Sequence, residues 1–522
     1  MSNSNDPSAL NYAAAPNAQR LLWAGFIAIL AAGVGFSVRG ASVLAAWSES
    51  FGFTQTVLGG ITGGGLVGFG IVIIISSFLA EAVGYSRLMY MAFGVHFLSA
   101  VVTLAAPAVF AAAGKDATYW TLFVGMFLFA IGNGICEAVV NPLTATLFPN
   151  NKTHYLNILH AGWPAGLILG GVAAIYMADT VSWQIQISLF LIPVLIYGFM
   201  IFGQTMPKTE AAEAGVSVGE ILKQLAAPLL LFLLLVHAMV GYVELGTDSW
   251  IARITGSILD ETTGRWLFVY TSALMFILRF VAGPIVHKIS PLGLLFASAI
   301  LATIGLYVLG GVGTTVAALI ALTIYGLGKT FFWPTMLAVV SERFPKGGAV
   351  TLGMVGGVGM LSAGLLGGPG IGFKQDKFAS EKLQELSPEA YDRYKAGSPN
   401  SFLVFEANGL DGQKIGTLAD GGKGLASELE ILEANDETNE NLTKLNDWWE
   451  ADAQANAESD LKPVNEATLH GSRMALKLTA IVPAVMAVCY LLLIGYFQTI
   501  GGYKALTVED VDGGSSGEGG EE

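Results

Sequence analysis

The chain has 522 residues, of which 53% are hydrophobic and only 13% are charged, and its formal net charge is −14. A water-soluble protein of this length needs more charge to stay in solution, so the composition indicates an integral membrane protein and excludes an ordinary soluble domain. Residues 21–373 carry as many acidic as basic side chains, so the net charge belongs mainly to residues 374–472, with 20 acids against 9 Lys and Arg, and to the tail.

Apolar runs of about 20 residues, the length that crosses a membrane as a helix, recur along the chain. Their backbone polar groups have no partners in lipid, so the runs must be helical. The first run is too long for a cleaved signal peptide and is expected to be a permanent span. We predict twelve spans, near residues 21–46, 57–80, 87–112, 119–147, 156–178, 181–203, 226–252, 265–288, 291–312, 315–340, 349–373 and 474–499.

The spans fall into two sets of six, separated by the polar linker "MPKTEAAEAGVSVGE". The halves repeat each other weakly, since "IGNGICEAVVNP" in the fourth span corresponds to "YGLGKTFFWP" in the tenth. Repeats of this kind, with a binding site where they meet near the bilayer midplane, are typical of transporters. The predicted fold class is therefore all-α, an integral membrane protein with twelve transmembrane helices in two pseudo-symmetric six-helix bundles.

The predicted organisation follows from these boundaries. It comprises an N-terminal tail (1–20), a first bundle (21–203), a linker (204–225), a second bundle (226–499) interrupted by an acidic loop between helices 11 and 12 (374–472), and an acidic tail (500–522). The loop contains helix-like pieces that predict a small helical cap, either a lid over the outer mouth or an inert insertion.

Basic residues in the short loops set the orientation. One side receives Arg20, Arg87, Lys152, Lys208, Lys223, Lys288, Arg343, Lys346 and Lys504, and the other receives Lys115, Arg253 and Arg265. We therefore expect a multi-pass protein of the inner (cytoplasmic) or plasma membrane with both termini in the cytoplasm and residues 374–472 outside.

Charged side chains inside spans cost roughly 2.5–3.5 kcal/mol each, so each needs a partner or a role. In the first half these are Arg39 and Glu137. They are expected to face each other, either as a structural ion pair or with a substrate or proton-coupling role for at least one of them. Glu137 is the proton candidate, because burial disfavours the charged form of a carboxyl group. Asn141 lies one turn beyond Glu137, and Pro142 frees a backbone carbonyl. This stretch is either a polar notch for solute or a proline kink with a capping asparagine.

In the seventh span, Glu244 and Asp248 are four residues apart and are expected on one face, with Tyr242 nearby. Carboxylates bind hydroxyl groups and aromatic faces stack on sugar rings, so these residues are candidates for sugar binding. Asp248 has a second interpretation as a solvated acid at the outer membrane surface.

In the tenth span, Tyr325, Lys329 and Trp333 form one stripe at four-residue spacing. Lys329 requires a counter-charge, for which Glu244 is the candidate. Trp333 is either a stacking platform or a packing residue.

In the fifth span, His160 and Trp163 are candidates for the cavity wall beside Asn157, and packing is the alternative for His160. Arg279 in the eighth span is expected to be a gating or structural charge near Glu342 or backbone carbonyls.

The segment after the second span contains Glu81, Gly84 and Arg87, which match part of the signature of the major facilitator superfamily, although Ala82 replaces its arginine. Outside residues 374–472 the whole chain resembles that superfamily. The pattern of Glu137, Asn141 and Pro142, with Asn157 in the fifth span, is similar to the fucose and hexose proton symporters. The resemblance implies gating roles for the signature residues; His160 and Arg39 depart from it, standing where a glutamine and an acid are expected.

These features predict a secondary active transporter that moves a small polar solute, a monosaccharide, by proton-coupled alternating access. The alternative ligand is an organic anion, a carboxylate or phosphate held by Arg39, Lys329 and His160. A non-transporting receptor is disfavoured by the buried charges. We expect no enzyme activity, cofactor or metal, and a monomer whose partners are the solute, protons and the lipid bilayer, with no nucleic acid. Cys136 and Cys489 lie in spans and are expected to be unpaired.

Overall fold

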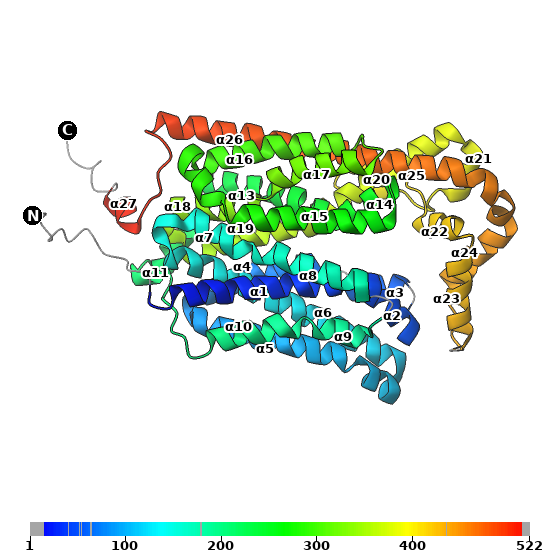
Figure 1. The fold of residues 1–522 in the computed structure, drawn as a ribbon, viewed down its shortest axis with the longest axis horizontal. Coiled ribbons are helices and arrows are strands. Elements are labelled where there is room, and N and C mark those ends of the chain that lie inside the picture. Colours follow the sequence, from blue (N-terminus) through cyan, green and yellow to red (C-terminus); the bar gives the residue numbers. More distant parts are fainter. Residues whose placement is uncertain are drawn as a thin grey trace, which may run out of the picture.

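The computed structural model describes residues 15–513 except 40, 52, 54, 63, 64, 178, 179 and 435. Most of the expected N-terminal tail and the end of the C-terminal tail lie outside these residues. The long helices run side by side along one direction, with both ends of the described chain at one end of the molecule and the segment 388–448 at the other (Figure 1). These two ends are called the terminal side and the cap side.

The first bundle contains ten helical segments. They are α1 (Ala18–Val38), α2 (Ala41–Phe51), α3 (Gln55–Thr62), α4 (Gly65–Val83), α5 (Tyr85–Leu104), α6 (Ala106–Leu147), α7 (Lys152–His160), α8 (Gly162–Met177), α9 (Trp183–Ser188) and α10 (Leu191–Ile201), with a 3-10 turn, η1 (Pro149–Asn151), before α7. Gly114 has a φ of 78° and bends α6 near the cap side.

The linker forms α11 (Glu210–Glu213) and α12 (Val218–Leu225). The second bundle follows as α13 (Pro228–Gly241), η2 (Tyr242–Gly246), α14 (Thr247–Ile258), α15 (Glu261–Arg279), α16 (Ala282–Leu309), α17 (Thr315–Lys329), α18 (Phe332–Arg343), η3 (Pro345–Gly347), α19 (Gly348–Ser362), η4 (Ala363–Gly367), α20 (Gly368–Leu386), α25 (Ala457–Thr479) and α26 (Ile481–Thr499), and α27 (Val508–Gly513) ends the described chain. The segments η2 and η4 are π-helices.

In the described part of the chain, 11 helices are long and apolar enough to cross a membrane. The expected eighth span is α15, whose 19 residues include Glu261, Arg265 and Arg279. Large apolar side chains such as Phe199, Leu235 and Ile277 are exposed on the outside of the bundles, as lipid contact requires. The all-α membrane fold with twelve transmembrane helices is confirmed.

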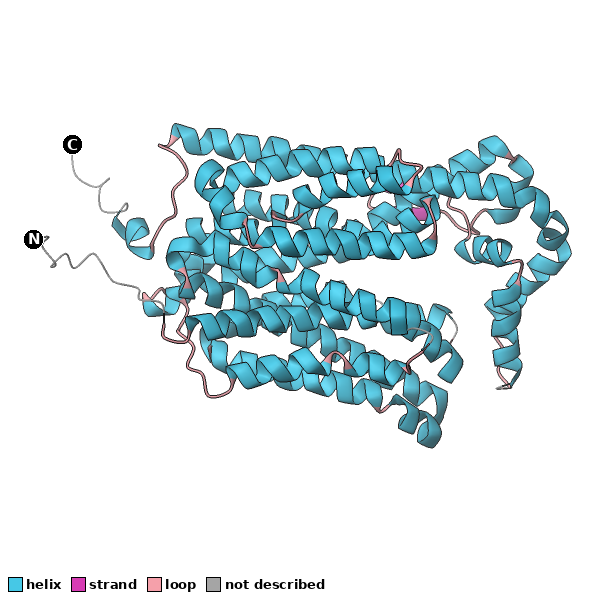
Figure 2. Cartoon of the chain, viewed as in Figure 1, coloured by secondary structure: helices cyan, strands magenta, loops and turns pink. Residues whose placement is uncertain are grey.

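The cap extends from α20 and α25, two helices that pack against each other and continue beyond the second bundle. It contains α21 (Pro388–Tyr394), β1 (Asn400–Phe402), β2 (Phe405–Ala407), α22 (Gly412–Asp420), α23 (Lys423–Ala434), α24 (Glu440–Trp448), η5 (Trp449–Ala453) and η6 (Gln454–Asn456). The two strands pair as a small antiparallel hairpin, the magenta element in Figure 2.

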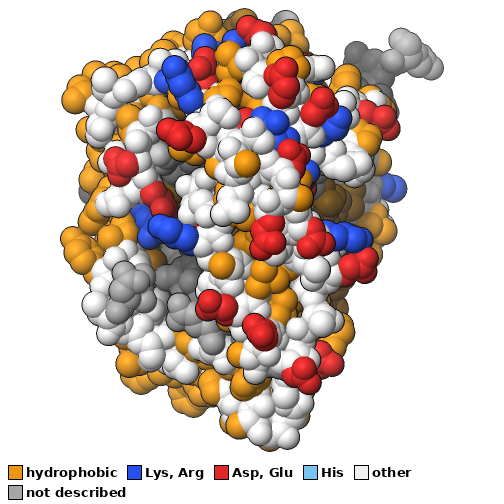
Figure 3. All heavy atoms as spheres, turned by 90° about the vertical axis from the view of Figure 1, so that its right-hand side faces the viewer, with side chains coloured by type: hydrophobic (Ala, Val, Ile, Leu, Met, Phe, Trp, Pro, Cys, Tyr) orange, Lys and Arg blue, Asp and Glu red, His pale blue; other side chains and the backbone are white. Residues whose placement is uncertain are grey.

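The cap has its own apolar core, which includes Leu383, Tyr394 and Trp449. Arg393 donates from Nε and Nη2 to the two carboxylate oxygens of Asp460 at 2.7 and 2.6 Å. Acidic side chains, interspersed with fewer basic ones, are spread over the face of the molecule at this end (Figure 3). The predicted helices are therefore present, and they form a packed unit.

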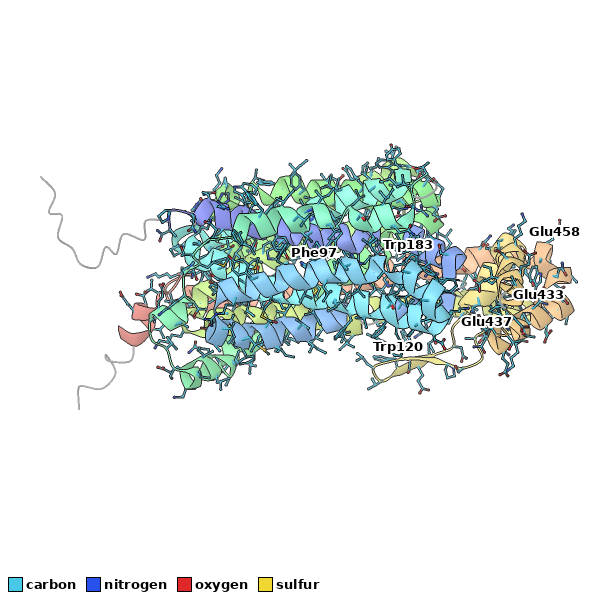
Figure 4. The ribbon with its side chains drawn as sticks, turned by 90° about the horizontal axis from the view of Figure 1, so that it is seen from below. Phe97, Trp120, Trp183, Glu433, Glu437 and Glu458 are labelled. Carbon is cyan, nitrogen blue, oxygen red and sulfur yellow. The ribbon has the colours of Figure 1, made fainter. Side chains whose placement is uncertain are left out.

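An ion pair links the cap to the first bundle: Lys115 on α6 pairs with Glu437. Glu437 and Glu433 lie in the cap beside the end of the bundle that carries Trp120 and Trp183 (Figure 4). Because the cap continues from helices of the second bundle, this ion pair connects the two halves on the cap side.

The bundles also pack directly against each other, chiefly through α4 on α19 and α8 on α15. A Cβ atom at Gly70 of α4 would lie 2.9 Å from the carbonyl oxygen of Gly357 on α19. Glycine at this position therefore allows the two backbones to approach closely, as small residues do between membrane helices.

Candidate functional site

One face of α6 carries a row of functional side chains through the first bundle. Phe129, Asn133, Glu137 and Asn141 follow each other at four-residue spacing, and all are buried. Residues four apart on a helix lie one above the other on the same face. The row therefore places two amides and an acid on one line that runs along α6 toward the terminal side.

Glu137 binds its neighbour in this row. The amide nitrogen of Asn141 donates to the Glu137 carboxylate at 2.7 Å and to the Glu137 backbone carbonyl at 3.0 Å. The Asn141 oxygen is 2.8 Å from Nε2 of His160 on α7. Since Asn141 uses its NH₂ group on Glu137, its oxygen accepts, and His160 donates from Nε2. Asn141 thus links the acid to the histidine.

The chain of contacts continues into the second bundle through Arg279 on α15, which is 1% exposed. Its Nη1 donates to the backbone carbonyl of His160 at 2.5 Å, and its Nη2 donates to Glu244 at 2.9 Å. Its Nε donates to the carbonyl of Thr330 at 3.0 Å. The expected contact with backbone carbonyls is present, but the acid is Glu244 and not Glu342.

The expected pairing of Lys329 with Glu244 is wrong, because Lys329 forms its ion pair with Asp248. The sequence predicts Glu244 and Asp248 on one face; Glu244 lies in the π-helix η2 and Asp248 in the first turn of α14. Glu244 binds Arg279 on α15, and Asp248 binds Lys329 on α17. The interpretation of Asp248 as a solvated surface acid is also wrong, since its side chain is only 9% exposed.

The other aromatic candidates of the second bundle hold this region together. The Tyr325 hydroxyl donates to the carbonyl of Val243 at 2.8 Å, and the Tyr242 hydroxyl accepts from Lys374 at 3.0 Å. Trp333 is buried, and its backbone N–H lies 3.3 Å from Glu244. Each of these groups stabilises the π-helical region, which supports the packing interpretation of Trp333.

Arg39, at the C-terminal end of α1, does not contact Glu137, so the expected pairing of these residues is wrong. Its Nη1 donates to the carbonyl of Gly35 at 3.2 Å and its Nη2 to the Ser99 hydroxyl at 3.3 Å. Its guanidinium lies 4.2 Å above the ring of Phe129. Phe129 precedes Glu137 by two helical turns, about 12 Å along α6, which is too far for an ion pair.

A cavity of about 610 Å³ opens in the cap-side half of the first bundle. Its wall includes Phe36, Arg39, Phe129, Asn133 and Trp163, together with Gly364 from the second bundle. Trp163 therefore lies where the sequence predicted, in a cavity wall. The other expected solute ligands are not in this wall: Asn141, Asn157, His160, Tyr242, Glu244, Asp248, Tyr325, Lys329 and Trp333.

On the terminal side, α6 and α7 of the first bundle pack against α18 of the second, and a pocket between α6 and α18 has a volume of about 10 Å³. Asn157 contributes to this packing, because its amide nitrogen donates to the Thr335 hydroxyl at 3.3 Å across the bundles. Thr153 donates to Glu342 at 3.2 Å in the same region. Asn157 is thus placed in the contact between α7 and α18, away from the cavity.

The signature residues also lie on the terminal side. Glu81 accepts from the Thr209 hydroxyl at 2.5 Å and from the backbone N–H of Ala349 at 2.9 Å, so it joins α4 to the linker and to α19. Gly84 has a φ of 86° and precedes α5. Arg87 is exposed. A gating role for these residues stays a prediction.

Sequence reasoning missed two residues of the site, Asn133 and His96. The two ring nitrogens of His96 on α5 lie 2.9 Å from the Asn133 oxygen and 2.9 Å from the Tyr197 hydroxyl. Asn133 precedes Glu137 by four residues, a spacing that could have revealed it. The sequence offers no comparable signal for His96. In the part of the chain that the structure describes, no group of three His, Cys, Asp or Glu side chains is arranged to hold a metal ion.

The arrangement has two helix bundles, a buried polar network between them, packing between the bundles at one end and a cavity toward the other, a plan typical of membrane transporters. The sequence profile of the Major Facilitator Superfamily matches residues 25–368, and the chain belongs to this superfamily.

Solved structures of transporters share the fold. FucP, a Major Facilitator Superfamily transporter in the outward conformation, is 18% identical, with a TM-score of 0.57 over 69% of this chain and 92% of its own. The proton:xylose symporter XylE is 14% identical, with a TM-score of 0.56 over 67% and 87%. A bacterial homologue of the iron transporter ferroportin is 14% identical, with a TM-score of 0.53 over 66% and 89%. No curated protein matches the sequence.

Proposed function

We propose that the protein is a secondary active transporter that couples the movement of a small polar solute to protons, with Glu137 as the proton carrier. The observation that carries the proposal is the unbroken series of contacts from Glu137 through Asn141, His160 and Arg279 to Glu244. It supports coupling because it joins Glu137, the buried acid of α6, to the second bundle.

Protonation of Glu137 changes this series in a defined way. A buried carboxylate whose hydrogen-bond partner is a neutral amide is expensive in its charged form, so the site favours proton uptake when the cavity opens to an acidic side. The neutral carboxyl group accepts less strongly from Asn141, because hydrogen bonds to ionised groups are roughly twice as strong. The amide is then free to change partner, and the link to His160 weakens with it.

We assign the solute to the size class of a monosaccharide. The cavity of about 610 Å³ accommodates one, and Phe36, Phe129 and Trp163 provide aromatic walls of the kind on which sugar rings stack. The similar structures FucP and XylE are described as a fucose:proton and a xylose:proton symporter, which supports the same class. The second candidate, an organic anion, is favoured by Arg39, which has no acidic partner among the described residues.

We place both termini in the cytoplasm, the cap outside the cell, and the protein in the inner or plasma membrane as a monomer. The charge distribution of the short loops supports this orientation. In it, the terminal side faces the cytoplasm and the cavity lies toward the outside, so the structure corresponds to a state that receives solute from outside.

Uptake into proteoliposomes tests the proposal. An inward proton gradient should drive accumulation of a labelled solute from a panel of neutral and acidic monosaccharides above its external concentration, and a protonophore should abolish the accumulation. Uptake that stops at equal concentrations with and without the gradient would contradict proton coupling.

A further inference from the structure

Arg39 is a buried cation without a counter-charge. It is 4% exposed, and its hydrogen-bond acceptors are a backbone carbonyl and a hydroxyl group. No carboxylate of the described residues pairs with it. A buried charge that lacks a partner is costly, so an anion that reaches Arg39 gains free energy that a neutral solute does not.

The guanidinium also has unused donors. It carries five N–H groups in a planar fork, and Gly35 and Ser99 each accept from one terminal nitrogen. Its Nε is buried and has no hydrogen-bond partner. A carboxylate is the group that satisfies such a fork best, because its two oxygens accept two parallel bonds from one arginine.

The surroundings hold the guanidinium in a fixed position. It lies 4.2 Å from the ring centre of Phe129 and 4.8 Å from that of Phe190, an arrangement stabilised by cation–π attraction. A Cβ atom at Gly35 would lie 2.4 Å from the Phe129 ring and 2.9 Å from Nη1 of Arg39. The absence of a side chain at Gly35 therefore makes room for both groups, and Arg39 sits in a shaped pocket.

This pocket belongs to the cavity of about 610 Å³, and among the described residues of the cavity wall Arg39 alone is charged. Asn133, in the same wall, supplies a polar group for hydroxyls, and Trp163 supplies a ring face. A ligand that uses all three has one negative charge, several hydroxyl groups and an apolar ring face.

We infer that the solute is a sugar acid, a monosaccharide-sized monocarboxylate whose carboxylate binds Arg39. The inference rests on the proposed function for the identity of the site, and it unites the two candidate solute classes in one ligand.

Binding to the purified full-length protein tests the inference without a proton gradient. The probes are glucuronate, gluconate, glucose, the neutral methyl ester of glucuronate, and inorganic phosphate, and the readouts are thermal stabilisation and calorimetric affinity. Glucuronate should bind at least about tenfold more tightly than glucose and the ester, because an ionic hydrogen-bonded pair is lost in both neutral probes. Gluconate keeps the carboxylate but has no ring, so it should bind more weakly than glucuronate.

Variants then assign the binding to Arg39. Arg39→Gln should weaken carboxylate binding about tenfold or more, and Arg39→Lys should restore part of the affinity, since lysine keeps the charge and loses the fork. Gly35→Ala, which keeps Arg39 but crowds it, should weaken the same probes. Arg265→Gln, on the exposed part of α15, is the matched control and should bind as the wild type does.

The outcomes separate this inference from the proposed function. Equal affinity for neutral and acidic sugars, phosphate as the sole ligand, no binding of either acid, or unchanged carboxylate affinity in folded Arg39→Gln would each overturn the sugar-acid inference. A different result would overturn the proposed function and leave the sugar-acid inference standing. In that case carboxylate binding depends on Arg39, but solute uptake is the same with and without the proton gradient.

Discussion

Arg279 on α15 and Glu244 in η2 form an ion pair at 2.9 Å, with side chains 2% and 3% exposed. The same guanidinium reaches the backbone of the first bundle at His160. The pair therefore orients the group that connects the two halves, and it lies where a π-helix interrupts the helical register.

Removing one partner of this pair should destabilise the protein strongly. Glu244→Gln leaves the Arg279 charge buried and unpaired, which costs roughly 3–5 kcal/mol. The midpoint of thermal unfolding in detergent should fall clearly, and the double variant with Arg279→Gln should recover part of the loss. A Glu244→Gln protein as stable as the wild type would show that the pair contributes nothing to this arrangement.

Replacing the amide between Glu137 and His160 should uncouple transport. Asn141→Ala removes the donor to the carboxylate and the acceptor for the histidine, at a cost of about 1–3 kcal/mol for the buried groups left unpaired. We expect reduced uphill uptake with retained solute binding. Thr262→Ala, on the exposed end of α15, serves as a control. Normal accumulation in a folded Asn141→Ala protein would remove Asn141 from the coupling route.

Sugar-acid transport with one proton should move no net charge. The proton and the monocarboxylate neutralise each other, so a potassium diffusion potential imposed with valinomycin should leave initial glucuronate uptake unchanged, while a pH gradient should raise it. A neutral sugar that carries one proton would respond to both. Strong stimulation of glucuronate uptake by an inside-negative potential would contradict this stoichiometry.

The link between the cap and the first bundle should have little effect on stability and a clear effect on local motion. Lys115 and Glu437 are 22% and 36% exposed, and ion pairs at such positions contribute about 0–1 kcal/mol. Lys115→Glu should increase hydrogen exchange in α23, because two acids then repel, and Lys115→Glu with Glu437→Lys should restore protection. Unchanged exchange in the single variant would mean that the ion pair does not hold the cap in place.

The helices could be predicted from the sequence because each apolar run has to satisfy its own backbone in lipid. The partners of the buried charges could not, because they depend on the rotation of each helix about its axis. Glu244 and Asp248 bind cations on different helices, Arg279 on α15 and Lys329 on α17, and no residue pattern predicts the π-helix η2. The orientation of Arg39 toward Phe129 depends on packing between α1, α5 and α6, which the sequence does not show. Asn133 could have been predicted, because it lies four residues before Glu137 on the same helix face.

Exchange and uphill uptake by Glu137→Gln, measured side by side in proteoliposomes, test the central claim most directly. The account predicts that this variant exchanges labelled for unlabelled solute at equal pH and fails to accumulate solute against its gradient, because glutamine mimics the protonated acid permanently. Glu261→Gln, an exposed acid of α15, should retain both activities. Accumulation by Glu137→Gln at the wild-type level would contradict the assignment of Glu137 as the proton carrier.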